Sequence, residues 1–289
     1  MTTTALARSA THEHPWPHRY SMVVAAVTLL AVTAGGLVTS TGSGYASPEP
    51  VLMDRFQGTG LFEHSHRVLA WIVGTLVLGS VVLFGAVEKR TWVRRLTIGA
   101  LAAVAAQGAL GIFTVKLKLP PQVSIAHAAL AEITFALVVA IALVTSSTWG
   151  TPPVAGQDLD KTRRRALATM VVVYLQVLIG AWYRHTSSPL ALWAHILWVI
   201  VVGIHVMMMK HSRALLGLFM LQLVMGPIAL MFTKGKVIHA VGEAPESLAH
   251  AVPITIHVAL GALMFAASVV CFLMAARDSR QASAQVAAS

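Results

Sequence analysis

Charged residues and cysteine are both scarce in this chain of 289 residues. Asp, Glu, Lys and Arg together make up 11% of it, and Cys271 is the only cysteine. One thiol excludes an internal disulfide framework and a paired-cysteine redox centre within the chain. With 56% hydrophobic residues and a mean hydropathy of +0.73, the low charge also excludes an ordinary water-soluble globular domain. The composition instead indicates a polytopic membrane protein.

In place of charge the chain has long apolar runs. Eight of them can cross roughly 30 Å of hydrocarbon at about 1.5 Å per residue, and because backbone polar groups must pair within lipid, each is expected to be an α-helix. The predicted fold is therefore all-α. The predicted spans are Tyr20 to Thr41, His64 to Val87, Leu96 to Val115, Val123 to Ser146, Ala166 to Tyr183, Leu190 to Met209, Ala214 to Phe232 and Val252 to Ala275.

The basic residues predict the topology. If the N-terminus is cytoplasmic, 14 of the 21 Lys and Arg residues fall in cytoplasmic segments and 7 outside, which agrees with the positive-inside rule. Both termini are then expected in the cytoplasm. The formal charge of +10 follows mostly from this bias and favours contact with anionic membrane lipid, so it does not indicate nucleic-acid binding.

Four histidines lie one to two turns inside different apolar segments and near one membrane face. They are His66, His127, His195 and His257. A single buried histidine is more often a packed, hydrogen-bonded group than a ligand, but four at one depth favour another interpretation, because ionisable groups in membrane helices are costly. Two imidazoles from facing helices can ligate a haem iron axially within a four-helix bundle. We therefore predict that these four residues bind haem iron in two pairs.

A repeated motif accompanies the histidines. Gln and Gly stand four residues apart in three helices, at Gln107 and Gly111, Gln176 and Gly180, and Gln222 and Gly226. This spacing places both residues on one helix face, where Gly permits close approach of a neighbouring helix and the amide can hydrogen-bond across it. We interpret the motifs first as packing devices; contact of the three glutamines with a haem edge is the alternative.

The spacing of the histidines predicts two halves. His66 and His127 are 61 residues apart, and His195 and His257 are 62 apart. We expect two tandem four-helix bundles. The predicted organisation is a cytoplasmic tail at 1–19, an N-terminal half at 20–146, a linker at 147–165, a C-terminal half at 166–275 and a cytoplasmic tail at 276–289.

The two halves differ beside the first histidine. Glu63 precedes His66 by three residues and Arg67 directly follows it. Three residues before the other histidines, His127, His195 and His257, stand Ser124, Leu192 and Ile254 respectively. One interpretation makes Glu63 a cap of the first helical turn and lets Arg67 extend outward. The other makes the N-terminal half a reaction site. The outer loop from Gly42 to Phe62, roughly 20 residues long, supports the second interpretation because long loops often act as lids.

Two further ionisable residues lie deep in predicted helices. Glu132 is about 140° around its helix from His127, so packing or pairing elsewhere is expected in place of iron ligation. His205 lies about 15 Å deeper than His195 and roughly 80° away in helical angle, and is not expected to be a ligand.

The sequence resembles the haem A synthase family over nearly its whole length. The matching features are Gly35 to Thr39 with Thr41 to Gly44, Glu63-x-x-His66-Arg67, Gln107 to Gly111, His127, Gln176 to Gly180 with Arg184-His185-Thr186, His195 and His257. The resemblance implies an oxidoreductase of a bacterial cell membrane that oxidises the C8 methyl group of haem O to a formyl group, making haem A for terminal oxidases.

The resemblance also implies a division of labour. Substrate haem O would lie between His66 and His127, a b-type haem cofactor would lie between His195 and His257, and Glu63 would be the essential carboxylate. Arg67, Arg184 and His185 are candidates for contact with a haem edge, although for His185, expected in an outer loop, a solvent-facing side chain is the first interpretation. Haem O synthase and assembly factors of terminal oxidases become candidate partners, and association with further copies of the chain stays open.

The chain departs from its relatives in the first outer loop. Many bacterial relatives carry a cysteine pair there, and Gly42 to Phe62 has none, which puts thiol-dependent transfer of electrons or haem in doubt. The loop before His195 is also shorter than usual. Two other functions fit the residues: a di-haem b-type electron-transfer cytochrome linked to quinol, and a transporter that uses histidines as proton carriers. The presence of Glu63 favours the enzyme over both.

Overall fold

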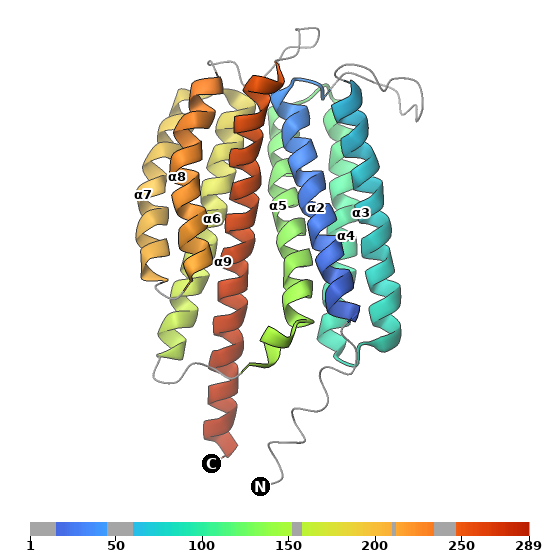
Figure 1. Cartoon of the computed structure of the whole chain (residues 1–289), viewed down its shortest axis with the longest axis vertical. Helices are drawn as coiled ribbons and strands as arrows, with labels where there is room; N and C mark the ends of the chain where they lie inside the picture. Colours follow the sequence, from blue (N-terminus) through green and yellow to red (C-terminus); the bar gives the residue numbers. More distant parts are fainter. Residues whose placement is uncertain (1–15, 45–59, 152–157, 210–211, 234–246, 289) are drawn as a thin grey trace.

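Eight long helices form the described part of the chain. The computed structural model describes residues 16–44, 60–151, 158–209, 212–233 and 247–288, and in these ranges eight helices are long and apolar enough to cross a membrane. The predicted all-α fold class is confirmed. The helices run side by side (Figure 1) as α2 (Trp16–Ser40), α3 (Gly60–Val87), α4 (Thr91–Lys116), α5 (Pro121–Val144), α6 (Leu159–Thr186), α7 (Pro189–Met208), α8 (Arg213–Thr233) and α9 (Leu248–Ala288), with a short 3₁₀ helix η1 (Ser147–Gly150) after α5.

Several helices extend beyond their predicted ends. α3 begins at Gly60, so Glu63 lies inside its first turn, and α6 begins after Asp158, whose side chain accepts a hydrogen bond of 2.9 Å from the backbone N–H of Lys161. The predicted linker at 147–165 and tail at 276–289 therefore contain helix. Apolar runs mark the hydrocarbon thickness alone, and polar turns can continue a helix past it. Residues 1–15, 45–59 and 152–157 of the predicted tail, outer loop and linker lie outside the described residues.

The helix neighbours follow one pattern in each half of the chain. α2 and α4 each pack against α3 and α5, and α6 and α8 each pack against α7 and α9. Between these two sets, α9 contacts α2 and α5, and α5 also contacts α6. α2 and α5 thus correspond to α6 and α9. The pattern agrees with tandem four-helix bundles, although the division into two bundles stays an interpretation.

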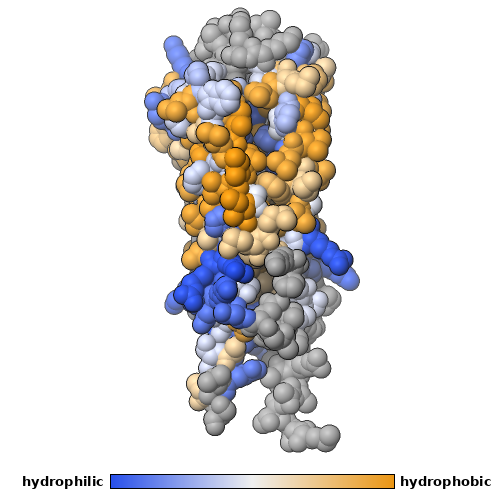
Figure 2. Space-filling model, turned by 90° about the vertical axis from the view of Figure 1, so that its left-hand side faces the viewer, coloured by the Kyte–Doolittle hydropathy of each residue, from blue (hydrophilic) through white to orange (hydrophobic). Residues whose placement is uncertain are grey.

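The centre and the rim of the assembly differ in side-chain size. Where α2, α5 and α9 meet, Phe135, Ala262 and Ala266 form a buried cluster. Large apolar side chains cover the outside, and Trp71 and Met231 are 77% and 78% exposed. Figure 2 shows this apolar band between hydrophilic regions. Such a surface suits lipid, which is as apolar as the side chains facing it.

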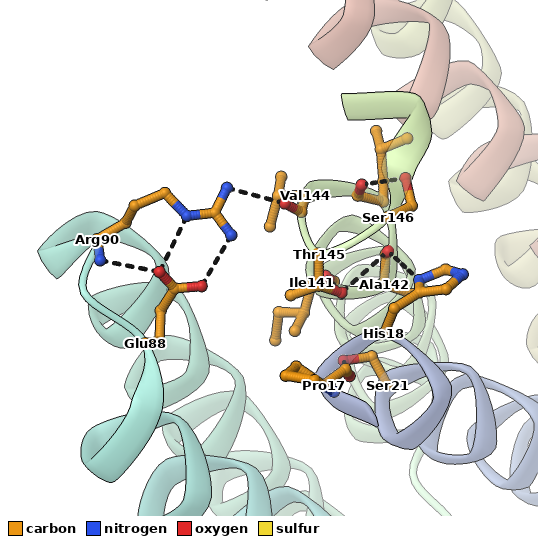
Figure 3. A network of polar contacts seen from close by, with 11 residues as sticks. Pro17, His18, Ser21, Glu88, Arg90, Ile141, Ala142, Val144, Thr145 and Ser146 are labelled. Atoms are coloured by element: carbon orange, nitrogen blue, oxygen red, sulfur yellow. Dashed lines mark hydrogen bonds and ion pairs between the residues drawn. The ribbon is translucent and has the colours of Figure 1, made fainter. Parts of the chain in front are cut away.

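Basic side chains hold the C-terminal end of α5 (Figure 3). Arg90 donates from Nη1 to the carbonyl oxygen of Val144 over 3.0 Å, and His18 Nδ1 lies 2.9 Å from the carbonyl oxygen of Ala142. Arg277 of α9 donates from Nη1 to the carbonyl oxygens of Thr148 and Trp149 in η1. Helix C-termini carry unpaired carbonyls and a partial negative charge, which cations stabilise. These contacts tie α2, α9 and the start of α4 to α5.

The ion pair behind Arg90 predicts a pH dependence of stability. Glu88 accepts from Arg90 Nη2 over 2.7 Å. Burial raises the pKa of Glu88, but hydrogen bonds from the Arg90 side chain and backbone, with the charges of Arg90 and Arg94, outweigh burial and hold that pKa below its usual value. The pair therefore stabilises the fold above the unfolded-state pKa of about 4.3, and this stabilisation disappears as pH falls through the folded-state pKa.

Glu88→Gln should consequently lower the melting temperature in detergent at neutral pH, because it removes the charge of the pair. The difference from the wild type should shrink as the pH falls below about 4.3. Melting curves of both proteins across this range make the comparison. A difference that stays constant with pH would contradict the role given to the carboxylate.

Candidate functional site

The four predicted histidines form two pairs near one end of the helix assembly. The ring centroids of His66 and His127 are 6.5 Å apart with an interplanar angle of 87°, and those of His195 and His257 are 6.2 Å apart at 81°. His66 comes from α3 and His127 from α5, while His195 comes from α7 and His257 from α9. Each half of the chain therefore contributes one pair from two helices, in matching positions.

Each imidazole packs edge-on against a glycine of the preceding helix. A Cβ added at Gly180 would lie 2.8 Å from His195 Cε1, and one at Gly35 would lie 2.9 Å from His66 Cε1. The corresponding distances for Gly111 with His127 and Gly226 with His257 are 3.3 and 3.4 Å. A methyl group at Gly180 or Gly35 would have to displace the ring, whereas at Gly111 and Gly226 it would fit against the ring tightly. The four glycines are thus seats that let the helices approach and define where each imidazole lies.

Glutamine fixes the backbone of three of these histidines. Nε2 of Gln107, Gln176 and Gln222 donates over 3.0 Å to the backbone carbonyl oxygen of His127, His195 and His257 respectively. These contacts agree with the interpretation of the Gln-Gly motifs as packing devices. Because a carbonyl only accepts, the nitrogen of each amide must face it, which leaves the three Oε1 atoms buried without a hydrogen-bond partner.

His66 is held differently. The residue that precedes Gly35 by four is Ala31, not Gln, and His66 Nδ1 donates over 3.0 Å to the Ala31 carbonyl oxygen. This bond places the ring proton on Nδ1 and leaves the lone pair on Nε2. His127 and His195 reach the same tautomer by another route, since Nε2 of each lies 3.4 Å from a glutamine amide nitrogen, which can only donate.

The pairs fit an iron porphyrin by spacing and donor chemistry. Two imidazoles on opposite sides of one metal, with metal–nitrogen bonds of about 2.0 Å, have ring centroids roughly 6 Å apart. The observed 6.5 and 6.2 Å agree with this spacing. Nδ1 of His127, His195 and His257 is buried without a hydrogen-bond partner among the described residues. Among the described residues no three His, Cys, Asp or Glu side chains converge as metal ligands.

The pair in the N-terminal half has a carboxylate one helical turn away. Glu63 is 4% exposed in the first turn of α3 and forms an ion pair with Arg67 of the same helix. Arg67 therefore does not simply extend outward, as the capping interpretation expected, because its guanidinium turns back to Glu63. The matching turn of α7 contains the Ser188 cap and Pro189, and it has no acid.

Arg184 and His185 lie in the last turn of α6. The prediction that His185 lies in an outer loop is wrong, because α6 continues to Thr186. The side chains of Arg184 and His185 are both partly buried. Arg184 donates from Nη2 to the Gly36 carbonyl oxygen over 2.6 Å and to Ser40 Oγ over 2.7 Å, both on α2. Its charge acts on His257, and His185 lies close enough to His127 for their charges to interact.

Glu132 and His205 stand apart from the paired imidazoles. Glu132 is 5% exposed, and its Oε2 atom has no hydrogen-bond partner. It interacts electrostatically with Tyr174, whose hydroxyl donates to the Ala129 carbonyl oxygen. His205 Nδ1 on α7 is also buried without a partner among the described residues, and the His205 carbonyl oxygen accepts from Thr169 Oγ1 of α6 over 3.5 Å. Within the described part of the chain, neither residue forms a hydrogen bond with a member of the pairs.

A comparison with protein families decides between the functions left open by the residues. Residues 45–285 match the family model COX15-CtaA, described as cytochrome oxidase assembly protein. The chain belongs to the COX15-CtaA family. Its members are haem A synthases, which are haem-dependent oxidoreductases involved in assembling terminal oxidases, so the resemblance found in the sequence is confirmed. A search of curated proteins found no match.

Sequence reasoning missed the seat of His66. Gly35 was noticed as part of a motif, but its role was hidden because Ala31 replaces the glutamine that marks the other three seats. One signal could have found it: Gly35 precedes His66 by 31 residues, and Gly226 precedes His257 by 31. The partners of Arg184 on α2 were missed as well, since no sequence pattern joins residues 148 positions apart.

Enlarging a glycine seat should disturb haem binding. In Gly180→Ala the new methyl group must push against His195, and overpacking of this kind costs about 1–3 kcal/mol. We expect the purified protein to retain less haem and to show an altered Soret band. Gly108→Ala is the matched control, because a Cβ there meets nothing within 4 Å. Equal haem content and spectra in the two variants would show that the seat does not position the ligand.

Proposed function

We propose that this chain makes haem A by oxidising the C8 methyl group of haem O, with substrate and cofactor held in different halves. Haem O lies between His66 and His127, and a b-type haem lies between His195 and His257. The observation that carries this assignment is the buried Glu63 beside one pair only. Two histidine pairs in equal surroundings would suit two equivalent haem cofactors. A carboxylate beside one pair alone suits a substrate haem at that pair and a permanent haem cofactor at the other.

Glu63 is proposed as the catalytic residue. Its carboxylate stands one turn from His66, at the periphery of the space between His66 and His127, where the edge of a bound porphyrin would lie. There it can accept a proton from the methyl group as its C–H bond is oxidised, or balance positive charge that develops on that carbon. Arg67 holds the carboxylate in place and compensates its charge in a region of low polarity.

His66 is proposed as the more basic ligand. Its Nδ1–H group donates to the Ala31 carbonyl oxygen, and such a bond to the second ring nitrogen orients a ligand and raises its basicity. The other three histidines have no such acceptor at Nδ1 in the described structure. The haem iron would supply the redox chemistry, and His66 would bind it on the side where Glu63 acts.

The remaining assignments follow the same proposal. Gln107, Gln176 and Gln222 hold the backbone of their histidines, and their free Oε1 atoms, with Arg67 and His185, are candidates for contact with a haem edge. The distribution of Lys and Arg supports a cytoplasmic location for both termini. The histidine pairs then lie toward the outer face, and haem O enters from the membrane or its partners.

Replacing Glu63 separates catalysis from haem binding. Glu63→Gln keeps the shape of the side chain and removes its charge, so we expect haem A formation to fall at least a hundred-fold, in line with the loss of one acid–base group. The b-type haem spectrum should persist. The measurement is extraction of haem types, with pyridine haemochrome analysis, after co-expression with a source of haem O.

Glu132→Gln is the matched control, because Glu132 is a buried carboxylate of the same half that bonds to neither histidine pair. Its haem A yield should resemble that of the wild type. An unchanged yield in Glu63→Gln would remove the catalytic role of Glu63. Loss of all bound haem in His66→Ala, in place of loss of conversion alone, would overturn the division between substrate and cofactor halves.

A further inference from the structure

Arg184 joins the two halves of the chain through one arm of its guanidinium. Nη2 donates to the Gly36 carbonyl oxygen and to Ser40 Oγ, both on α2, although Arg184 itself belongs to α6. Ser40 Oγ in turn accepts from Thr255 Oγ1 of α9 over 3.3 Å. One guanidinium arm therefore links α6, α2 and α9 near the outer end of the helices.

The other arm of Arg184 has no partner. Nη1 is buried and makes no hydrogen bond, and no carboxylate of the described residues pairs with the guanidinium. A cation within a membrane-embedded bundle is costly unless it is compensated, and neutral oxygens on α2 compensate it only in part. The unfilled half of a planar fork is the complement of an oxyanion such as a carboxylate or a phosphate group, both of which guanidinium groups bind with paired hydrogen bonds.

The position of Arg184 indicates which carboxylate it takes. Its charge acts on His257, a proposed ligand of the cofactor haem. Gly36, which its first arm holds, is the neighbour of Gly35, the seat of His66. Arg184 is therefore at the boundary between the two proposed porphyrin sites, and its charge acts on a ligand of the site in the C-terminal half.

We propose that Arg184 is a carboxylate-binding residue that holds a propionate of the porphyrin in the C-terminal half through Nη1 while Nη2 keeps α2 in place. The inference rests on the proposed function. In addition to that function, Arg184 would bind both the cofactor haem and α2, the helix whose Gly35 packs against His66. Loading of the cofactor site thus fixes the orientation of Arg184 and, through it, the stretch of α2 that packs against His66.

Porphyrin esters test the proposal directly. The probes are iron protoporphyrin IX and its dimethyl ester, which lacks free carboxylates, added to purified full-length protein in detergent. His66→Ala/His127→Ala is used as the background, so that only the C-terminal pair binds iron. We expect this protein to prefer the free acid by roughly ten- to a hundred-fold, the range for a hydrogen bond between charged groups.

Arg184→Gln in the same background should reduce the preference for the free acid to about two-fold or less. The preference of Arg184→Lys should lie between those of the background protein and Arg184→Gln, because a single ammonium cannot bind both α2 and the propionate at once. The midpoint potential of the bound haem should also fall in Arg184→Gln, since the propionate charge is no longer compensated. Arg94→Gln is the control: Arg94 also has a buried nitrogen without a partner, but it lies at the other end of the helices on α4.

The outcomes separate this inference from the proposed function. Absence of haem binding in the background protein, together with unchanged binding in His195→Ala, would contradict the assignment of the cofactor site itself. Haem binding without preference for the acid would show that Nη1 serves another anion, such as a lipid phosphate, and would overturn the inference alone. A preference that Arg184→Gln leaves intact would do the same. Should Arg184→Gln fail to fold, Arg184→Lys and the background protein still decide the result.

Discussion

The contact between an imidazole and a bare glycine Cα is the constraint on which the rest of the site depends. In a membrane, water gives no hydrophobic force for helix association, so helices come together where small residues let them approach. Here each approach has a histidine ring in it, at Gly35, Gly111, Gly180 and Gly226. The same packing that joins neighbouring helices therefore also orients the ligands. Stability of the bundle and geometry of the site cannot be changed independently.

One of the four glycine–histidine contacts differs from the other three in how the histidine is held. Three histidines are held by glutamine at the backbone, and their ring nitrogens Nδ1 stay without an acceptor. At His66 the glutamine is absent, and the ring itself bonds to the backbone of α2. The missing glutamine contact thus coincides with a direct hydrogen bond to the imidazole ring, and it occurs beside Glu63. The matching helix contacts give the two halves a common frame, and this substitution gives the proposed reaction site a ligand environment of its own.

The predictable part of the molecule is the part that a membrane dictates. Apolar length shows eight spans, and the cost of imidazole in lipid singles out His66, His127, His195 and His257. Helix ends such as Gly60 and Thr186 were predicted wrongly, because a hydropathy window detects the hydrocarbon and not the polar turns that continue a helix beyond it. His185 was placed in a loop for this reason. Contacts between distant residues, such as Arg184 with Gly36, depend on how the two halves dock, and local patterns do not contain that information.

The two ends of the assembly are organised for different tasks. At the end where α2 begins, side chains of three segments, Arg90, Arg277 and His18, converge on carbonyl oxygens at the end of α5 and in η1, and every one of these acceptors is a backbone atom. At the opposite end, where the histidine pairs lie, three glutamine oxygens, three imidazole nitrogens and one arm of Arg184 have no hydrogen-bond partner among the described residues. Unpaired polar groups are costly where water is absent, so a cluster of them is where a bound ligand would stabilise the fold most. Because α5 is anchored at one end and contributes His127 at the other, the network of basic side chains supplies a rigid support for the histidine pairs.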